Sequence, residues 1–323
     1  MIKPRVIITR RWPEAVEREL TAHFDVMFNP RDEPMADDAL AEAFMLADAV
    51  CPTVSDSLSS DVLQAADLRA GIIANFGAGI SHIDLEAARQ RRIIVTNTPD
   101  VLTDCTADLA IMLMLMVARR AGEGERELRA GGWRGWRPTH MVGTRVSGKT
   151  LGLIGFGRIA RAVALRAHSG FGMRVIYHTP HPPPLEVSEA FGARSIDSLE
   201  ELIAAADFIS VHCPGGEATR HLFNEERIAL VSRHAFLINT ARGEVVDSDA
   251  LIAALKAGRI AGAALDVYEG EPEVPDELKS MDNVVLLPHL GSASRETRIA
   301  MGMRVVENLN AFFAGREPPD RVT

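Results

Sequence analysis

The chain has 323 residues, and its formal net charge is −9 at pH 7. Hydrophobic residues make up 47% of it and charged residues 24%, which is enough apolar material for the cores of one large or two ordinary domains. The acidic balance argues against general nucleic-acid binding, but it leaves room for a local basic pocket that takes an acidic small molecule.

The sequence predicts a cytoplasmic protein without a membrane span. Residues 1–9 are typical of the start of a strand rather than of a signal peptide. The longest apolar run, at residues 109–118, is too short to cross a bilayer and predicts a buried core helix. The three cysteines are widely spaced and match no disulfide or metal framework, as expected in a reducing compartment.

Residues 5–98 alternate between short apolar segments and helical patterns. Strands are expected at 5–9, 25–28, 49–52, 71–75 and 93–96. Helices are expected between them, at 13–23, 36–46, 60–66 and 85–91. Short apolar strands that alternate with helices predict a parallel sheet covered on both faces, so this segment is expected to form one complete α/β domain.

A glycine-rich turn, Asn-Phe-Gly-Ala-Gly-Ile at residues 75–80, follows one of these strands. In open α/β sheets, ligands bind at the carboxyl ends of the strands. The backbone amides of Ala78 and Gly79 are therefore candidates for binding an anion. The alternative interpretation is an ordinary βα turn without a ligand.

Residues 98–100 are interpreted as a linker to a second domain. A long apolar helix is expected from Thr103 to about Arg120. The segment at 131–138 is irregular and contains two of the chain's three tryptophans. Tryptophan and arginine together are typical of an interface. The alternative is that the two rings cap a local core.

The most informative segment is a strand–turn–helix unit at residues 150–160. Leu151, Leu153 and Ile154 predict a short buried strand, and Gly155-x-Gly157-x-x-Ala160 follows it directly and opens an apolar helix. This is the context that a dinucleotide-binding fingerprint requires. Gly155 permits the tight turn, Gly157 lets the backbone approach a pyrophosphate, and Ala160 lets helix and strand pack closely. The free amides of the helix N-terminus would bind the pyrophosphate.

The residues after the next strand bear on the choice of cofactor. An NAD-specific site usually places Asp or Glu about 20 residues past the fingerprint, where it binds the ribose 2′-hydroxyl. Here that strand end carries His178, and the first acid after it is Glu186. Without a carboxylate, a 2′-phosphate meets no repulsion and finds candidate donors in His178, Thr179, His181 and Arg158. We therefore favour NADP over NAD, and no metal site is expected because the two histidines lack acidic or cysteine partners.

Further βα units complete the second domain. Strands are expected at 173–177, 207–213, 235–239, 260–267 and 284–287. A helix begins near Asp247 or Ser248, which are good N-cap types, and Gly258 ends it. A helical pattern at 295–313 closes the chain.

Three polar residues follow strands of this second domain: Arg242, Glu271 and His289. Taken singly, each has an ordinary explanation as a solvated cap, a surface acid or a structural histidine. Their joint placement at strand ends, on the side where a dinucleotide would bind, favours carbonyl reduction. A histidine can donate the proton to the carbonyl oxygen, and a neighbouring glutamate would stabilise its charged form. The planar fork of an arginine would bind a substrate carboxylate and polarise the adjacent carbonyl.

Seven motifs cover essentially the whole chain. They are Gly77-Ala-Gly-Ile, Asn97-Thr-Pro-Asp-Val-Leu-Thr-Asp, Gly131-Gly-Trp-Arg-Gly-Trp, Gly152-Leu-Ile-Gly-Phe-Gly-Arg-Ile-Ala, Asn239-Thr-Ala-Arg-Gly, Leu265-Asp-Val-Tyr-Glu-Gly-Glu-Pro and Pro288-His-Leu-Gly-Ser-Ala. Together they resemble the D-isomer-specific 2-hydroxyacid dehydrogenases, and most of all their glyoxylate/hydroxypyruvate reductase branch. The segment at 178–180 departs from both cofactor classes of that family, because it lacks the acid of NAD-type relatives and the arginine common in NADP-type relatives.

The resemblance implies an α/β fold with two Rossmann-like domains and parallel sheets. Residues 1–99 and 290–323 would form a flavodoxin-like substrate-binding domain that the C-terminal helix completes. Residues 100–289 would form the NAD(P)-binding Rossmann domain. The resemblance also implies a homodimer built on the nucleotide-binding domain, in which Trp136 of one subunit lines the substrate site of the other.

The expected site follows residue by residue. Arg242 would bind and polarise a 2-oxo acid, His289 would be the acid/base, and Glu271 would be its partner. Further substrate contacts are expected at Val54, Ala78, Gly79 and Trp136. Cofactor contacts are expected at Thr106, Gly155, Phe156, Gly157, Arg158, Ile159, His178, Thr179, Cys213, Pro214, Thr219, Thr240, Ala241, Arg242, Asp266, His289 and Gly291, with Asp266 near the nicotinamide.

The expected activity is NAD(P)H-dependent reduction of small 2-oxo acids, glyoxylate and hydroxypyruvate first. Glu271 argues against formate-type relatives, which carry glutamine at that position. A larger 2-oxo acid or phosphite is the alternative within the family, because phosphite-type relatives keep all three residues. A non-catalytic, nucleotide-sensing corepressor-like protein is the alternative outside it. Such a protein would need a peptide-binding surface or long tails, so the intact Arg–Glu–His set favours catalysis.

Overall fold

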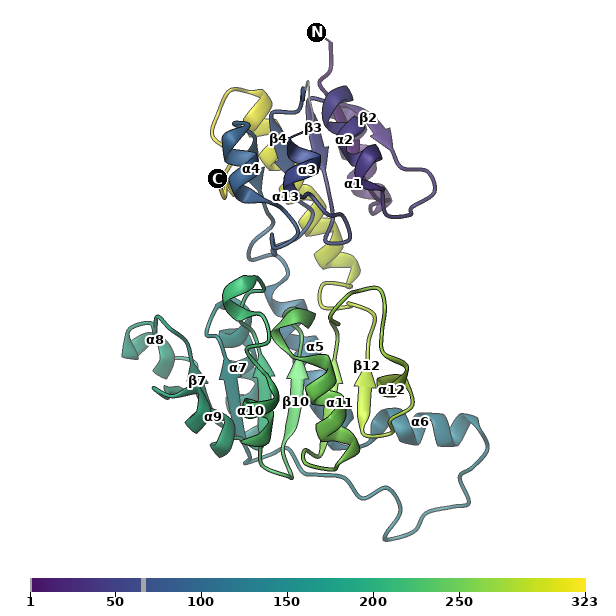
Figure 1. Ribbon diagram of the computed structural model, residues 1–323, viewed down its shortest axis with the longest axis vertical. Coiled ribbons are helices and arrows are strands. Elements are labelled where there is room, and N and C mark those ends of the chain that lie inside the picture. The colour runs from purple at the N-terminus through teal and green to yellow at the C-terminus, as the bar shows by residue number, and fades with distance from the viewer. Residues whose placement is uncertain (1, 65–67) are drawn as a thin grey trace. The chain divides into compact units, whose positions relative to one another are not determined.

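The computed structural model of the protein describes residues 2–64 and 68–323. The chain divides into two compact units (Figure 1). The first contains Met1–Leu102 and Ser292–Thr323, and the second contains Thr103–Gly291. The boundaries expected from the sequence, 99/100 and 289/290, lie within three residues of these.

The first unit is built on a parallel sheet in the order β2–β1–β3–β4–β5, which is the flavodoxin-like order. Both faces of the sheet are buried, because successive residues of one strand pack into different core clusters: Val50 on one face and Cys51 on the other. This explains the continuous apolar runs in the sequence. The strands are β1 (Arg5–Ile8), β2 (Asp25–Phe28), β3 (Ala49–Cys51), β4 (Ile72–Ala74) and β5 (Ile94–Thr96).

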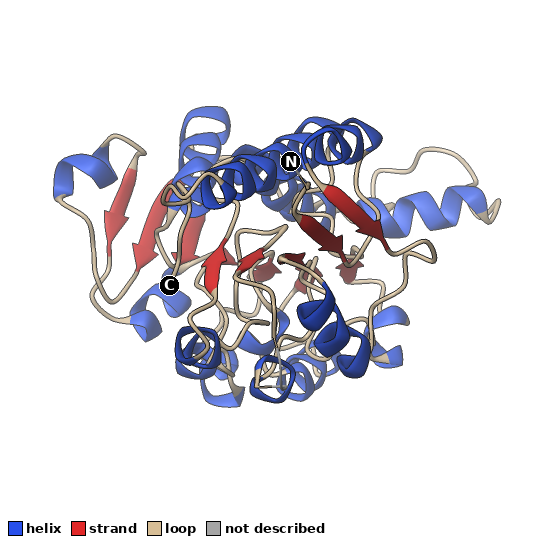
Figure 2. Cartoon of the chain, turned by 90° about the horizontal axis from the view of Figure 1, so that it is seen from above, coloured by secondary structure: helices blue, strands red, loops and turns tan. Residues whose placement is uncertain are grey.

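Helices lie on both sides of the strands (Figure 2). Those of the first unit are α1 (Glu14–His23), α2 (Asp37–Leu46), α3 (Ser60–Leu63), α4 (Leu85–Gln90) and α13 (Arg295–Phe313). The helix expected at 60–66 ends in α3 at Leu63, and the remainder of that prediction includes residues 65 and 66, which lie outside the described residues. The chain returns to this unit through α13, where a Cβ at Gly302 would overlap the Val16 side chain of α1. The C-terminal helix therefore completes the first unit.

The second unit contains a parallel sheet in the order β12–β11–β10–β9–β6–β7–β8. Read from β8, this is the doubly wound order 3-2-1-4-5-6 extended by one strand. The order reverses between β6 and β9, so β6 ends at the switch point where such sheets bind their ligands. The strands are β6 (Thr150–Ile154), β7 (Arg174–His178), β8 (Ala193–Ser195), β9 (Phe208–Val211), β10 (Phe236–Asn239), β11 (Gly262–Leu265) and β12 (Val284–Leu286).

The helices of the second unit include several that the sequence pattern did not reveal. They are α5 (Thr103–Ala118), α6 (Ala121–Arg129), α7 (Arg158–Phe171), α8 (Leu185–Glu189), α9 (Leu199–Ala205), α10 (Glu225–Ala229), α11 (Ser248–Lys256) and α12 (Asp276–Lys279), with the 3₁₀ turns η1 (Glu217–Thr219) and η2 (Gly243–Val245). The predicted N-cap of α11 is confirmed, because the Asp247 side chain accepts from the Ala250 amide. Strand β8 and helices α8, α9, α10 and α12 were missed because each is at most seven residues long. Helix α6, with nine residues, was also missed.

Helix α6 and the loop after it project from the rest of the second unit (Figure 1). Arg120 separates α6 from α5 with a left-handed backbone, at φ +54°. In the loop, Trp133 is 51% exposed and Trp136 is 82% exposed, so neither ring caps a local core in the single chain. Among the helices of the described residues, none is long and apolar enough to cross a membrane.

Candidate active site

The fingerprint turn joins β6 to α7 at the switch point of the second sheet. Gly155 has φ +91°, and a Cβ there would lie 2.9 Å from the backbone of His212 and Cys213. A side chain is therefore excluded both by backbone conformation and by the neighbouring strand end. Gly157 is the N-cap of α7, and a Cβ there would meet nothing within 4 Å, which leaves open space in front of the helix amides. Such a helix N-terminus is suited to a phosphate group.

Other fingerprint residues serve packing. Ala160 is fully buried, as expected for close contact between helix and strand. The Phe156 ring is buried and stacks on Tyr177 with 3.8 Å between ring centroids. The side chain of Phe156 thus belongs to the core, so its predicted cofactor contact is restricted to its backbone. Arg158 is exposed and Ile159 half-buried in the first turn of α7.

His178 is the last residue of β7, next to the fingerprint turn. Its carbonyl accepts from the Gly155 amide at 2.8 Å. The half-buried imidazole places Nδ1 3.0 Å from the Ile196 carbonyl oxygen. Thr179 follows as a half-buried residue in the loop before α8.

Asp266, just after β11, anchors the segment that carries His289. The His289 amide donates to the Asp266 carbonyl at 2.9 Å. The Asp266 carboxylate accepts from the amides of Leu290 at 2.6 Å and Gly291 at 2.8 Å. Burial raises the pKa of this carboxyl group, and the two amides and the charge of His289 act in the opposite direction. Held in this way, His289 takes a left-handed backbone at φ +54°, which is uncommon for a residue other than glycine.

His289 and Glu271 form an ion pair with 2.8 Å between Nδ1 and Oε2. The other Glu271 oxygen accepts from the Tyr268 amide at 2.8 Å, which fixes the carboxylate. Burial raises the pKa of Glu271, but the hydrogen bond and charge of His289, the Tyr268 amide and the charge of Arg242 outweigh it and hold the pKa below its ordinary value. An ionised carboxylate can only accept, so Nδ1 of His289 carries hydrogen and Nε2 is left for other partners.

Arg242 lies just before η2, in the turn that follows β10. Asn239 closes this turn, since its Nδ2 donates to the Arg242 carbonyl at 2.9 Å and its Oδ1 accepts from the Ala241 amide at 3.0 Å. The turn packs directly on the next loop, because a Cβ at Gly243 would collide with the Tyr268 backbone. Burial lowers the pKa of Arg242, while the charges of Glu244 and Glu271 raise it. Arg242 and His289 therefore both act electrostatically on Glu271.

The remaining predicted cofactor residues lie around the same strand ends. Thr240 is buried, and its Oγ1 has no hydrogen-bond partner within the described part of the chain. Thr219 Oγ1 donates to the Pro214 carbonyl at 2.7 Å. The hydroxyl of Thr106 on α5 donates its hydrogen to the Gly291 carbonyl at 2.9 Å, so it links α5 to the segment that carries His289. Burial raises the pKa of Cys213 to about 11, so its thiol stays neutral at physiological pH.

In the first unit, side-chain amides donate hydrogen bonds to three backbone carbonyls of the glycine-rich turn at 75–80. Asn75, fully buried, donates from Nδ2 to the carbonyls of Gly77 and Gly79, both at 3.0 Å. Asn97 Nδ2 donates to the Ala78 carbonyl at 2.8 Å. No described residue accepts from the amide of Ala78 or Gly79. These two amides are thus available to an anion, in the manner of a backbone nest.

The role of Asn75 was not predicted, although it directly precedes the turn in the sequence. His82 supports it, with 3.1 Å between Nε2 and the Asn75 Oδ1. Val54, which was predicted to contact substrate, is 41% exposed in the loop after β3.

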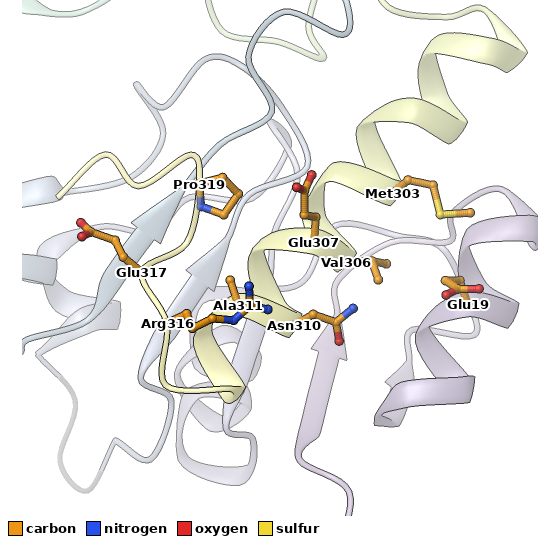
Figure 3. Close-up of a pocket in the computed structure, with 9 residues that line it drawn as sticks. All are labelled: Glu19, Met303, Val306, Glu307, Asn310, Ala311, Arg316, Glu317 and Pro319. Carbon is orange, nitrogen blue, oxygen red and sulfur yellow. The ribbon is translucent and has the colours of Figure 1, made fainter.

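A surface pocket of about 520 Å³ is found elsewhere in the first unit, at α1, α13 and the residues after α13 (Figure 3). It is lined by Glu19, Met303, Val306, Glu307, Asn310, Ala311, Arg316, Glu317 and Pro319. None of the predicted site residues is among them, so this pocket is not the candidate site.

Comparison with known proteins agrees with this geometry. Residues 111–291 match the family described as D-isomer specific 2-hydroxyacid dehydrogenase, NAD binding domain. The chain belongs to this dehydrogenase family. Its nucleotide-binding domain is accordingly one for a nicotinamide dinucleotide, and the predicted fold of two Rossmann-like domains is confirmed.

Three relatives of this 2-hydroxyacid dehydrogenase illustrate the similarity. A glyoxylate reductase of Thermococcus kodakarensis is 44% identical over 99% of this chain and 96% of its own. A solved protein of Thermus thermophilus is 43% identical with a TM-score of 0.89, covering 99% of this chain and 100% of the other. A solved NADPH-dependent glyoxylate/hydroxypyruvate reductase of Sinorhizobium meliloti, in complex with NADP and malonate, is 35% identical with a TM-score of 0.87 over 99% of this chain and 97% of its own.

Proposed function

We propose that this dehydrogenase reduces small 2-oxo acids to 2-hydroxy acids, with glyoxylate and hydroxypyruvate as its first substrates. The observation that carries the proposal is the His289–Glu271 pair, coupled to Arg242 at strand ends of the unit that holds the dinucleotide fingerprint. The names of the relatives support it, since glyoxylate reductases match nearly the whole chain.

The residues divide the chemistry among them. A bound reduced nicotinamide dinucleotide supplies the hydride. As charge builds on the substrate oxygen, His289 donates a proton from Nε2, because Nδ1 is held by Glu271. The Arg242 guanidinium binds the substrate carboxylate and polarises the adjacent carbonyl. The amides of Ala78 and Gly79 are proposed to bind the carboxylate as well.

The residues around β6 fit a dinucleotide. Gly157 leaves open space before the α7 amides, where a pyrophosphate would bind. The Thr240 hydroxyl, which has no hydrogen-bond partner among the described residues, lies at the end of β10, two strands away from β6. His178 replaces the usual acid, so the 2′-phosphate of NADP is accepted without repulsion. We therefore propose NADP as the favoured cofactor and NAD as the other.

The experiment is to follow the loss of reduced-cofactor absorbance with glyoxylate and with hydroxypyruvate, using NADPH and NADH in turn. Turnover with either substrate supports the proposal, and faster turnover with NADPH supports the cofactor preference. A failure with both substrates and both cofactors would reject it. Larger 2-oxo acids and phosphite would then be assayed in the same way.

We expect Glu271→Gln to reduce kcat by about 10²-fold or more, because an amide does not stabilise an imidazolium as a carboxylate does. When the pH is raised, the rate of reduction should begin to fall at a lower pH in this variant than in the unaltered enzyme. Profiles of kcat against pH measure both effects. Glu273→Gln, at a nearby exposed carboxylate, is the matched control and should change neither.

Asn75→Ala is expected to raise the KM for glyoxylate by about tenfold, because two carbonyls of the turn lose the amide that orients them. The KM for NADPH should be unchanged. Asn29→Ala is the control, since Asn29 Nδ2 also donates to two carbonyls of the first unit, those of Thr9 and Glu33. Equal effects of the two variants on glyoxylate KM would contradict a role of the turn in anion binding.

We further propose a homodimer built on the second unit, in which α6 and the loop at 130–145 reach the partner. The exposure of Trp136 at 82% and of Leu128 at 61% supports this, because large apolar side chains in a projecting segment favour an interface. Light scattering should give twice the chain mass, and Trp136→Ala should raise the KM for glyoxylate. A monomeric mass at micromolar concentration would reject the dimer.

A further inference from the structure

The hydrogen bond of His178 determines which of its ring nitrogens can donate. Nδ1 lies 3.0 Å from the Ile196 carbonyl oxygen, which can only accept, so Nδ1 carries a hydrogen. In the neutral ring, Nε2 is then without hydrogen and can only accept. Protonation adds the hydrogen at Nε2 and converts it from an acceptor into a charged donor.

His178 occupies the position at which dinucleotide-binding sheets contact the adenosine ribose. It ends β7, the neighbour of β6, and its carbonyl is bonded to the Gly155 amide of the fingerprint turn. At this strand end an Asp or Glu normally accepts from the 2′-hydroxyl of NAD. A neutral Nε2 offers the same accepting function, whereas a charged ring repeats the role of the basic side chain that binds the 2′-phosphate of NADP.

Both cationic and anionic groups lie on the elements packed against β7. They are Arg158, Arg161, Arg166 and His168 on α7, Arg194 on β8, Asp197 after β8, and Glu200 and Glu201 on α9, with His181 in the loop after β7. Arg166 is paired with Asp104 and Asp108, and β6 contributes no titratable side chain. His212, at the end of β9, stays neutral above about pH 5, because burial lowers its pKa to about 4.

We propose that His178 selects between the two cofactors by its protonation state. The neutral ring accepts from the ribose 2′-hydroxyl of NAD, and the charged ring donates to the 2′-phosphate of NADP. Preference for NADP therefore increases as the pH falls. This inference rests on the proposed binding of a nicotinamide dinucleotide at the fingerprint, and it does not depend on which acid is reduced.

The test is calorimetric binding of NADP⁺ and NAD⁺ to the full chain, without substrate, between about pH 8 and about pH 5.5, the range in which histidines change charge. The ratio of the NAD⁺ Kd to the NADP⁺ Kd should rise about tenfold over this range, as expected for one charge-assisted hydrogen bond. The 2′-phosphate itself loses charge near pH 6, which works in the opposite direction. A rise in the unaltered protein is therefore informative even without a variant.

Two variants isolate the group. In His178→Asn, the side-chain amide can still donate to the Ile196 carbonyl, but it does not titrate. The ratio of the NAD⁺ Kd to the NADP⁺ Kd should then decrease as the pH is lowered, because only the 2′-phosphate changes its charge. His234→Asn removes an exposed histidine of the second unit that lies away from the strand ends of the site, and it should behave as the unaltered protein does. The proposal is overturned if the ratio does not rise in the unaltered protein, if His178→Asn shows the same rise, or if neither cofactor binds. Binding with the expected pH dependence but without turnover of 2-oxo acids would reject the proposed function and leave this inference standing.

Discussion

Replacement of His289 by glutamine should lower kcat for glyoxylate reduction by about 10²–10⁴-fold, the usual contribution of a general acid. Glutamine keeps a polar group of similar length but cannot carry the proton that Nε2 delivers. The Kd of NADPH should change little, because the backbone of His289, which Asp266 anchors, is retained. Stopped assays of kcat together with fluorescence titration of NADPH measure the two quantities separately.

The control for this variant is His234→Gln. His234 also pairs with a carboxylate in the second unit, with 2.9 Å between Nε2 and Asp207 Oδ1, but it lies away from the strand ends of the site. Its replacement should leave kcat within about twofold of the unaltered enzyme. If both histidine variants lose activity equally, or if His289→Gln remains fully active, another group donates the proton.

Arg242→Lys should lower kcat/KM for glyoxylate by about 10²–10³-fold, comparable to the loss of one donor that stabilises a developing oxyanion. Lysine keeps the charge but replaces a rigid planar fork with a single ammonium, which cannot bind carboxylate and polarise carbonyl in the same plane. Burial of this position should add to the loss of kcat/KM, because the ammonium of lysine is more strongly hydrated than the half-buried guanidinium that it replaces and is more costly to bury.

The Arg242 guanidinium donates to the Ala241 carbonyl at 2.6 Å. Arg233→Lys provides the matched control, since the Arg233 guanidinium of the same unit donates in the same way to the Gly258 carbonyl at 2.9 Å. It should leave kcat/KM unchanged. Full activity of Arg242→Lys would show that only the positive charge matters at this position. Loss of NADPH binding in that variant, with the fold intact by circular dichroism, would instead assign Arg242 to the cofactor.

The elements that could be predicted from sequence are those whose local pattern and packing agree. Helix α13 was expected at its observed bounds, and Asp247 was identified as a helix N-cap from residue type alone. The edge strand β8 and helix α6 were missed for physical reasons. Strand β8 is three residues long, which is too short for an alternating pattern to be detected, and α6 contains two glycines, which lower the helix propensity of its nine residues.

The sequence by itself determined the family, and it identified the fingerprint and the three candidate residues Arg242, Glu271 and His289 from residue type and from the order of strand, turn and helix. Only the tertiary structure decided how those side chains are held. Asp266 and Asn75 act through hydrogen bonds to backbone groups brought to them by folding, and such bonds leave no periodic pattern. The tautomer of His178 likewise depends on the Ile196 carbonyl, which the return of the chain after β8 brings to within 3.0 Å. Which nitrogen carries the proton is therefore a property of the fold and not of the residue.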